Sequence, residues 1–201
     1  MKKGLMIVIS GPAGSGKGTV NAHLLATGEF EYSVSATTRA PRPGEVDGVN
    51  YHFISREEFE ARIAAGGMLE YTEYCGNYYG TPRKEAEEVL ASGKNLILEI
   101  EVEGARNVKT RYPEAVLIVL LPPSFKVQEQ RLRGRGTETE EKILERLERT
   151  RAEIKESTFY DYVVYNYDGA DKIAANEIYA IVTAEKHAMR RSEPVANTYF
   201  D

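Results

Sequence analysis

The sequence predicts an α/β fold: a phosphate-loop (P-loop) domain whose parallel five-stranded sheet is flanked by helices, with two inserted subdomains. Short apolar runs alternate with stretches of helical spacing, which favours a parallel sheet covered on both faces by right-handed crossovers. The first apolar run leads into a glycine-rich loop and then a helix. Two arginine-rich stretches, residues 35–83 and 125–157, lack the alternation and are expected to be the insertions.

The glycine-rich loop over residues 11–19 has the composition of a phosphate cradle. It follows a short apolar strand, residues 5–9, and precedes a helix expected to end near Gly28. Its glycines let N–H groups surround a phosphate, the helix N-terminus adds partial positive charge, and Lys17 can reach the terminal phosphates. The alternative is an ordinary glycine-rich turn between a strand and a helix.

One position departs from the usual phosphate-loop string. That string ends in Gly-Lys-Ser or Gly-Lys-Thr, whose hydroxyl ligates Mg²⁺. Here Gly18 follows Lys17, and the hydroxyl is displaced to Thr19. The ending resembles that of adenylate kinases more than those of motor ATPases or regulatory GTPases. We therefore hypothesise that Mg²⁺ is held mainly through water and other carboxylates.

A short predicted strand, residues 32–35, leads into the first inserted stretch. Two prolines then exclude a continuous helix, and residues 49–53 alternate like an edge strand. Arg39 and Arg42 are three residues apart and follow hydroxyl side chains, which suits an anion site. A solvated charged loop is the alternative.

Capping residues and glycines delimit the rest of this insertion. Ser55 begins a capping box and therefore a helix. Residues 68–74 alternate loosely, and the aromatic-rich residues 76–80 are predicted to form a turn. A second helix is expected with Pro82 in its first position, and Gly93 after its end.

A second buried strand is predicted over residues 95–103, and its end carries carboxylates at Glu99, Glu101 and Glu103. These acids are one polar face if the strand is an antiparallel edge. Because an interior parallel strand is apolar on both faces, we expect them at its carboxyl end, where open α/β sheets bind ligands.

The second half of the chain continues the alternation. The mixed charge of its longest predicted helix, including Arg149, is typical of a solvated face. The tail after Met189 is polar and is expected to be loose. The remaining predicted elements are strands over residues 115–121 and 160–166, and helices over 124–134, 140–157 and from 171 onward.

Composition limits the function classes. The formal charge of −5 argues against a general nucleic-acid-binding protein but not against local basic pockets. The single cysteine, Cys75, excludes an internal disulfide and a cluster of thiolate ligands. No apolar stretch approaches the roughly 20 residues that cross a bilayer, and the N-terminus does not resemble a signal peptide. We expect a cytoplasmic protein.

Several separated strings, in this order, resemble the guanylate kinase family of nucleoside monophosphate kinases over nearly the whole chain. The second and third are highly specific to that family. The strings are Gly-Pro-x-Gly-x-Gly-Lys (residues 11–17), Ser-Val-Ser-x-Thr-Thr-Arg-x-Pro-Arg-x-Gly-Glu (33–45), Gly-Asn-Tyr-Tyr-Gly-Thr (76–81), Arg-Gly-Thr-Glu (135–138) and Tyr-Asp-Tyr-x-x-x-Asn (160–166).

The resemblance implies a GMP site, and residue chemistry supports it. Two arginines and two tyrosine hydroxyls can clamp a monophosphate. The carboxylate of Glu70 can accept hydrogen bonds from both N1–H and the N2 amino group of guanine, whereas adenine would place a lone pair against it. Hydroxyls of Ser35 and Thr81 suit the guanine O6. The residues assigned to GMP are Ser35, Arg39, Arg42, Tyr51, Glu70, Tyr79, Thr81, Glu99 and Glu101.

The resemblance also implies an ATP site and the reaction ATP + GMP ⇌ ADP + GDP with Mg²⁺. Mg²⁺ is expected mainly on water and ATP phosphates, with Thr19 and Glu101 nearby. The catalytic residues implied are Lys17, Arg39, Arg131, Arg135 and Arg146. The ATP-binding residues implied are Gly11, Pro12, Ala13, Gly14, Ser15, Gly16, Lys17, Gly18, Thr19 and Asn166.

Further departures and alternatives accompany this resemblance. Glu101 and Glu103 replace an aspartate and a glutamine of the family pattern, which suggests altered metal handling or rate. A catalytically silent interaction module and a GTP-hydrolysing switch are the alternatives. An intact loop lysine disfavours the first, and Gly18 disfavours the second.

The resemblance also implies a division of the chain and a set of partners. The expected partners are ATP and GMP, with neither nucleic acid nor a membrane, and either a monomer or a homo-oligomer. The expected units are a core (residues 1–34, 84–124 and 158–190), a GMP-binding subdomain (35–83), a lid (125–157) and a loose tail (191–201).

Overall fold

The computed structural model describes residues 3–74, 76–134, 136, 139–192 and 196–199. Its main sheet has five parallel strands in the order β2-β7-β1-β8-β9, which confirms the predicted fold class. The strands are β1 (Met6–Ser10), β2 (Phe30–Tyr32), β7 (Asn95–Leu98), β8 (Val116–Leu121) and β9 (Tyr162–Tyr165).

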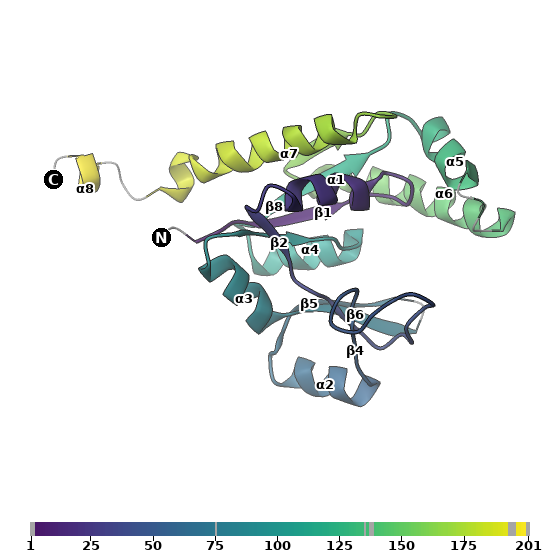
Figure 1. The fold of residues 1–201 in the computed structure, drawn as a ribbon, viewed down its shortest axis with the longest axis horizontal. Coiled ribbons are helices and arrows are strands. Elements are labelled where there is room, and N and C mark those ends of the chain that lie inside the picture. Colours follow the sequence, from purple (N-terminus) through teal and green to yellow (C-terminus); the bar gives the residue numbers. More distant parts are fainter. Residues whose placement is uncertain (1–2, 75, 135, 137–138, 193–195, 200–201) are drawn as a thin grey trace.

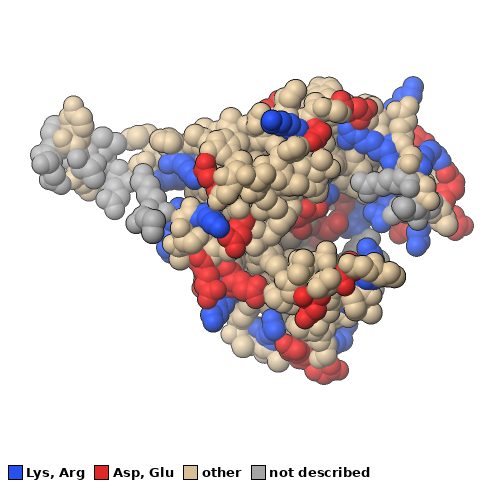
Figure 2. Space-filling view, viewed as in Figure 1, with Lys and Arg blue, Asp and Glu red and all other residues tan. Residues whose placement is uncertain are grey.

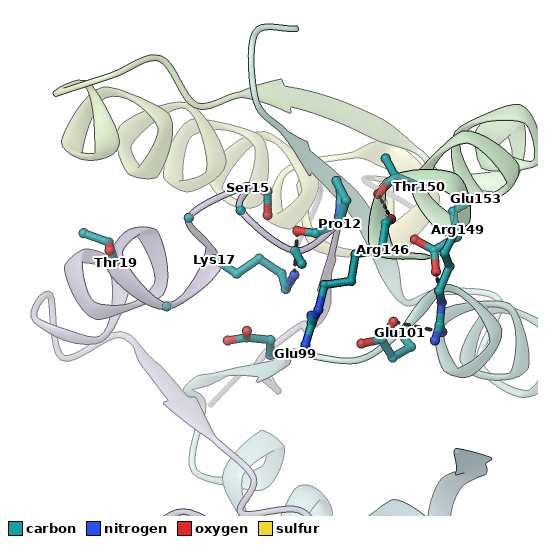
Figure 3. Close-up of a pocket in the computed structure, with 14 residues that line it drawn as sticks. Pro12, Ser15, Lys17, Thr19, Glu99, Glu101, Arg146, Arg149, Thr150 and Glu153 are labelled. Carbon is teal, nitrogen blue, oxygen red and sulfur yellow. Dashed lines mark hydrogen bonds and ion pairs between the residues drawn. The ribbon is translucent and has the colours of Figure 1, made fainter. Parts of the chain in front are cut away.

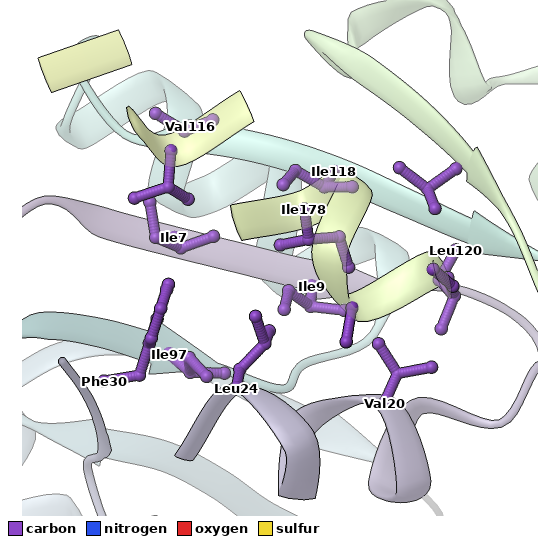
Figure 4. Close-up of a cluster of buried hydrophobic side chains, with 14 residues drawn as sticks. Ile7, Ile9, Val20, Leu24, Phe30, Ile97, Val116, Ile118, Leu120 and Ile178 are labelled. Atoms are coloured by element: carbon purple, nitrogen blue, oxygen red, sulfur yellow. The ribbon is translucent and has the colours of Figure 1, made fainter. Parts of the chain in front are cut away.

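Helices cover both faces of this sheet (Figure 1). α1 (Lys17–Leu25) and α7 (Asp171–Lys186) lie on one face, and α3 (Arg83–Ala91) and α4 (Val102–Arg111) lie on the other. Every residue of β1 and β7 is buried, as a sheet covered on both faces requires. Buried apolar side chains form one core on each face of the sheet. Figure 4 shows the larger of these cores, where Ile7, Ile9 and Ile97 pack against Leu24 of α1 and Ile178 of α7.

A second, four-stranded sheet lies within residues 36–82. Its order is β4 (His52–Phe53), β3 (Ala36–Thr37), β6 (Asn77–Pro82) and β5 (Met68–Tyr74). Helix α2 (Arg56–Ala64) packs on it through Phe59, whose ring stacks on Tyr78 with centroids 5.1 Å apart. As predicted, the Ser55 side chain caps α2 by accepting a hydrogen bond from the Glu58 N–H.

Helices α5 (Phe125–Gly134) and α6 (Glu140–Lys155) form a pair at one end of the molecule, beside the phosphate loop (Figure 1). Leu132, Ile143 and Leu147 form a small core between them. Two 3₁₀ helices (Ser157–Phe159 and Met189–Arg191) and a short helix α8 (Ala196–Tyr199) complete the described elements. Within the described residues, none of the helices is both long and apolar enough to span a bilayer.

Three predictions about elements need correction. The predicted turn at 76–80 is wrong, because residues 77–80 belong to strand β6, which begins directly after Gly76 (φ of 75°). The predicted strand over 95–103 ends at Leu98, since the chain turns into helix α4, which the sequence reading left unassigned. The predicted strand 32–35 lies earlier, at Phe30–Tyr32.

Candidate active site

The phosphate loop depends on two glycines for steric reasons. Gly16 precedes α1 with φ of 88°, and a Cβ there would lie 2.3 Å from Nδ2 of Asn166. A Cβ on Gly11 would lie 2.1 Å from the Leu120 carbonyl oxygen. The contact at Gly11 is with backbone, which cannot move aside, so the loop can pass β8 only with glycine there. At Gly16 the positive φ favours glycine, and a Cβ would also displace the Asn166 side chain.

Lys17 is the first residue of α1, and its ammonium group bends back over the loop. Nζ donates to the Gly11 carbonyl oxygen at 2.5 Å and to that of Pro12 at 3.3 Å. In Figure 3 the side chains of Lys17, Glu99 and Arg146 point toward a common space. The N-terminus of α1 and the Lys17 ammonium therefore direct positive charge to the same place.

That space is part of a cavity of about 360 Å³. It lies between the phosphate loop, the segment after β7, and helix α6. Its lining contains all but the first of the loop residues that the sequence assigned to ATP. The lining residues are Pro12, Ala13, Gly14, Ser15, Gly16, Lys17, Gly18, Thr19, Glu99, Glu101, Arg146, Arg149, Thr150 and Glu153.

A second cavity, of about 280 Å³, adjoins the first, because the two share Lys17, Glu99, Glu101 and Arg146. It extends toward the four-stranded sheet, and Figure 2 shows a hollow between this part of the molecule and the core. Most residues that the sequence assigned to GMP line it together. Those residues are Ser35, Arg42, Tyr51, Glu70, Tyr79, Glu99 and Glu101.

Glu70 is 2% exposed and comes from β5. Its carboxylate accepts a hydrogen bond at 2.8 Å from the hydroxyl of Thr81 on β6. Burial raises the pKa of Glu70 from its usual 4.5 to about 7, although Thr81 and Arg111 act in the opposite direction. The carboxylate also limits the packing of α4, since a Cβ on Gly104 would lie 3.3 Å from its Oε2. Thr81 thus orients Glu70 without lining the cavity itself.

Arg39 lies beside the second cavity but does not line it. Its Nη2 contacts both oxygens of Glu45, at 2.9 and 3.0 Å, and its guanidinium carbon lies 5.6 Å from the centre of the Tyr51 ring. These hydrogen bonds with Glu45 raise the pKa of Arg39. Glu45 also accepts the backbone N–H of Arg42 at 2.7 Å. Sequence reasoning gave Glu45 no role, although it lies inside the second family string.

Arg131 is bound to the phosphate loop, outside both cavities. Its guanidinium donates to the carbonyl oxygens of Gly14 (3.1 Å) and Asn166 (2.8 Å) and to the carboxylate of Asp168 (2.7 Å). The Asn166 side chain donates to the Ser15 carbonyl oxygen at 2.9 Å. Arg131 and Asn166 therefore bind the backbone of the phosphate loop from outside the two cavities. Arg135 lies outside the described residues.

Gln128 connects the loop to helix α6, and the sequence gave no sign of it. This α5 side chain is 1% exposed. Its amide nitrogen donates to the Ala13 carbonyl oxygen at 3.0 Å and to the Thr150 hydroxyl at 2.8 Å. Its role is visible only in the structure, which shows that the side chain is buried and what its amide contacts.

Arg149 lines the first cavity, contrary to the interpretation of its helix face as merely solvated. Its Nε donates to Glu153 at 2.7 Å, and its Nη2 lies 3.3 Å from Oε2 of Glu101. Glu101 is the N-cap residue of α4, so this ion pair joins the core to the α5–α6 unit (Figure 3).

The carboxylates suit a hydrated Mg²⁺ better than a closed protein cage. Within the described part of the chain, no group of three or more His, Cys, Asp or Glu side chains could hold a metal ion. Glu99 and Glu101 line both cavities, whereas Thr19 stands apart from them in Figure 3. Mg²⁺ keeps several waters and binds through one or two carboxylates plus phosphates, which this donor set can supply.

Comparisons with known proteins agree with this geometry. The guanylate kinase family model matches residues 3–183. The chain is 56% identical over 185 residues to a guanylate kinase of Halalkalibacterium halodurans, covering 92% of this chain and 90% of that one. It is 47% identical to that of Carboxydothermus hydrogenoformans, with 95% and 93% covered.

A solved structure gives the same result. The crystal structure of guanylate kinase from Anaplasma phagocytophilum superposes with a TM-score of 0.78 at 33% identity, covering 98% of this chain and 94% of that one. Two adjoining cavities built on a phosphate loop, a family model that spans most of the chain, and closely similar relatives lead to one conclusion. The chain belongs to the guanylate kinase family.

Proposed function

We propose that this protein transfers the γ-phosphoryl group of ATP to GMP, giving ADP and GDP. The observation that supports this most directly is the wall shared by the two cavities. Lys17 and Arg146 reach both, so their cationic groups can neutralise a phosphoryl group that passes from one cavity to the other. Phosphoryl transfer needs little beyond such positioning and charge stabilisation.

Glu70 is the proposed determinant of guanine. In its ionised form it accepts hydrogen bonds from N1–H and the N2 amino group, and the hydroxyl of Ser35, which lines the cavity, faces O6. Thr81 contributes to the guanine site through its hydrogen bond to Glu70. Adenine in the same place would leave a buried carboxylate unpaired, and buried polar sites of this kind discriminate strongly. The depth of Glu70, 2% exposed, supports this role because water cannot replace the missing donors.

The GMP phosphate is proposed to bind Arg42, Tyr51 and Tyr79, which line the second cavity. Arg39 would join them by moving from Glu45, to which it is hydrogen-bonded in the structure. Charge-assisted hydrogen bonds from guanidinium groups to phosphate are strong and directional. Glu45 therefore acts as a holding group that keeps Arg39 beside the cavity before GMP arrives.

The ATP phosphates are proposed to occupy the loop of residues 11–19, with Asn166 near the base. Lys17 would exchange its carbonyl contacts for phosphate oxygens, and Arg146, with Arg135, would approach the transferring group as the lid (residues 125–157) closes. Mg²⁺, which ATP oxygens and water would hold with Glu101 nearby, would supply charge neutralisation. Thr19, which stands apart from Glu101, is not proposed as a ligand of the same ion. We place this activity in the cytoplasm, without nucleic acid as a partner.

The experiment that tests the function is an assay of AMP, GMP, CMP and UMP as acceptors with ATP and Mg²⁺. We expect GMP to react at least about a hundredfold faster, judged by kcat/KM, than the others. A silent interaction module would phosphorylate none of them, and a GTP-hydrolysing switch would release phosphate from GTP without an acceptor. Glu70→Gln is the matched control, because it should weaken GMP and leave ATP binding intact.

A further inference from the structure

Glu99 occupies the wall that the two cavities share, directly after β7 ends at Leu98. One of its carboxylate oxygens, Oε2, accepts a hydrogen bond from the Asn21 side-chain amide at 2.9 Å and another from the Tyr32 hydroxyl at 3.2 Å. Two donors on one oxygen fix the carboxylate orientation. The other oxygen, Oε1, receives no hydrogen bond from the described residues and is available to a ligand.

Packing of helix α1 does not account for the presence of an asparagine at position 21. It lies in α1 one turn after Lys17, on the same helix face, and its side chain is fully buried. Its Oδ1 has no hydrogen-bond partner in the described part of the chain. A buried amide oxygen without a partner destabilises a fold relative to an apolar side chain of similar size. The asparagine therefore needs a reason other than stability.

Tyr32 supports the same carboxylate from strand β2. A tyrosine hydroxyl is protonated at neutral pH and can donate, and burial together with the negative charge of Glu99 raises the pKa of Tyr32 further. Glu99 is thus held by α1 and β2 of the core, whereas Glu101, two residues later, is paired with Arg149 of α6. Glu99 and Glu101 both line the two cavities, but their carboxylates are hydrogen-bonded or paired by different parts of the fold.

We propose that Asn21 is a positioning residue for phosphoryl transfer. Its amide, aided by the Tyr32 hydroxyl, holds Glu99 so that Oε1 accepts a hydrogen bond from an O–H donor where the two nucleotides meet. That donor is a sugar hydroxyl of the acceptor nucleotide or a water on the bound cation. Because Lys17 and Asn21 share one face of α1, a single helix places the donor phosphates and Glu99 in a fixed relation. This inference rests on the proposed transfer from ATP to GMP.

The test replaces Asn21 by leucine, which keeps the branching and the number of side-chain heavy atoms and removes the donor. We expect kcat/KM for GMP to fall about 10- to 100-fold, because Glu99 loses its orientation. The thermal unfolding midpoint should stay the same or rise, because the unsatisfied amide oxygen is gone. Tyr32→Phe, which removes only the longer hydrogen bond, should cost about threefold in kcat/KM.

A double variant shows whether Asn21 acts through Glu99. In a Glu99→Ala background, adding Asn21→Leu should change kcat/KM by less than about twofold, because the group it positions is absent. The full loss persisting in that background would contradict the proposal. So would an Asn21→Leu protein that melts at lower temperature but keeps the wild-type kcat/KM, since that result assigns Asn21 a purely structural role.

Calorimetry of GMP binding without metal separates the two donors. Weaker GMP binding by Asn21→Leu identifies a sugar hydroxyl. Unchanged binding together with a kcat that falls in Mg²⁺ identifies a metal-bound water. If neither changes, the proposal is wrong. Failure of the proposed function is recognised separately, because the wild-type protein would then not phosphorylate GMP at all.

Discussion

Oε2 of Glu101 lies 3.3 Å from Nη2 of Arg149, and this contact joins the first turn of α4 to the middle of α6. A second ion pair, between Arg106 and Glu156 at 3.0 Å, joins the same two helices nearer their other ends. These two ion pairs therefore add to the hydrogen bonds of Gln128 and Arg131 with the phosphate loop in attaching the α5–α6 unit to the core. An arginine of such an ion pair can leave its glutamate partner and bind an incoming polyanion instead.

Removing this attachment should affect nucleotide binding more than folding. Arg149→Ala should change the free energy of unfolding by less than about 1 kcal/mol, because the ion pair is solvent-accessible. Because Arg149 lines the phosphate-loop cavity, KM for ATP should rise several-fold, and the difference should shrink at high salt. Lys142→Ala, which removes one positive charge from the same helix outside both cavities, is the control. Equal KM effects of the two variants would show that only net charge matters.

The pKa of Glu70, about 7, makes GMP affinity depend on pH. Below pH 7 the carboxyl is protonated in the free protein, so binding guanine requires loss of that proton. KM for GMP should rise about tenfold per pH unit below 7 and level off above it. Glu70→Gln should bind GMP weakly at every pH and lose this dependence. A wild-type KM that stays flat from pH 5.5 to 8 would contradict this role.

The same carboxyl should lower stability at high pH. Its pKa in the folded protein is raised above the usual 4.5, so between pH 4.5 and about 7 the folded state binds more protons than the unfolded state. The free energy of unfolding should therefore decrease as pH rises through this window. Urea unfolding at pH 5 and pH 8 should show a loss in the wild type that is smaller in Glu70→Gln. An equal loss in both proteins would place the pH dependence elsewhere.

Two glycines of the phosphate loop should respond oppositely to alanine. Gly16→Ala places a Cβ 2.3 Å from Asn166 at a positive φ, and should lower stability by about 1–3 kcal/mol. Gly18 lies inside α1 with nothing within 4 Å of an added Cβ, so Gly18→Ala should raise stability by up to about 1 kcal/mol. Thermal unfolding of the two single variants measures both. Similar destabilisation by both would mean that the loop is strained in some other way.

The sequence predicted those parts of the protein whose causes are local. The strand, loop and helix around Lys17 follow from apolar periodicity and from glycine, and Ser55 caps its helix through residues three positions away. Strand β6 could not be found in this way, because Tyr78 is held by the backbone and side chain of Thr38, forty residues earlier. An aromatic-rich segment after a glycine is equally compatible with a turn and with a hairpin strand.

The same distinction applies to the site. Glu70 and Thr81 could both be assigned to a guanine site, because the family resemblance implied it and a carboxylate and a hydroxyl suit guanine. The contact of Arg149 with Glu101 could not, because charge pattern along α6 says nothing about an acid 48 residues earlier in the chain. Asn21 and Gln128 were missed for a related reason: each is one polar residue within a helix, and only tertiary structure shows what its amide contacts.

In the proposed reaction, two nucleotides bind end to end across the wall that the two cavities share. The decisive measurement is calorimetry with an adenosine and a guanosine joined through five phosphates. We expect one molecule to bind per chain, at least about a hundredfold more tightly than ADP or GMP alone, because one ligand fills both cavities. Affinity no better than that of ADP, unchanged by Glu70→Gln, would contradict the claim.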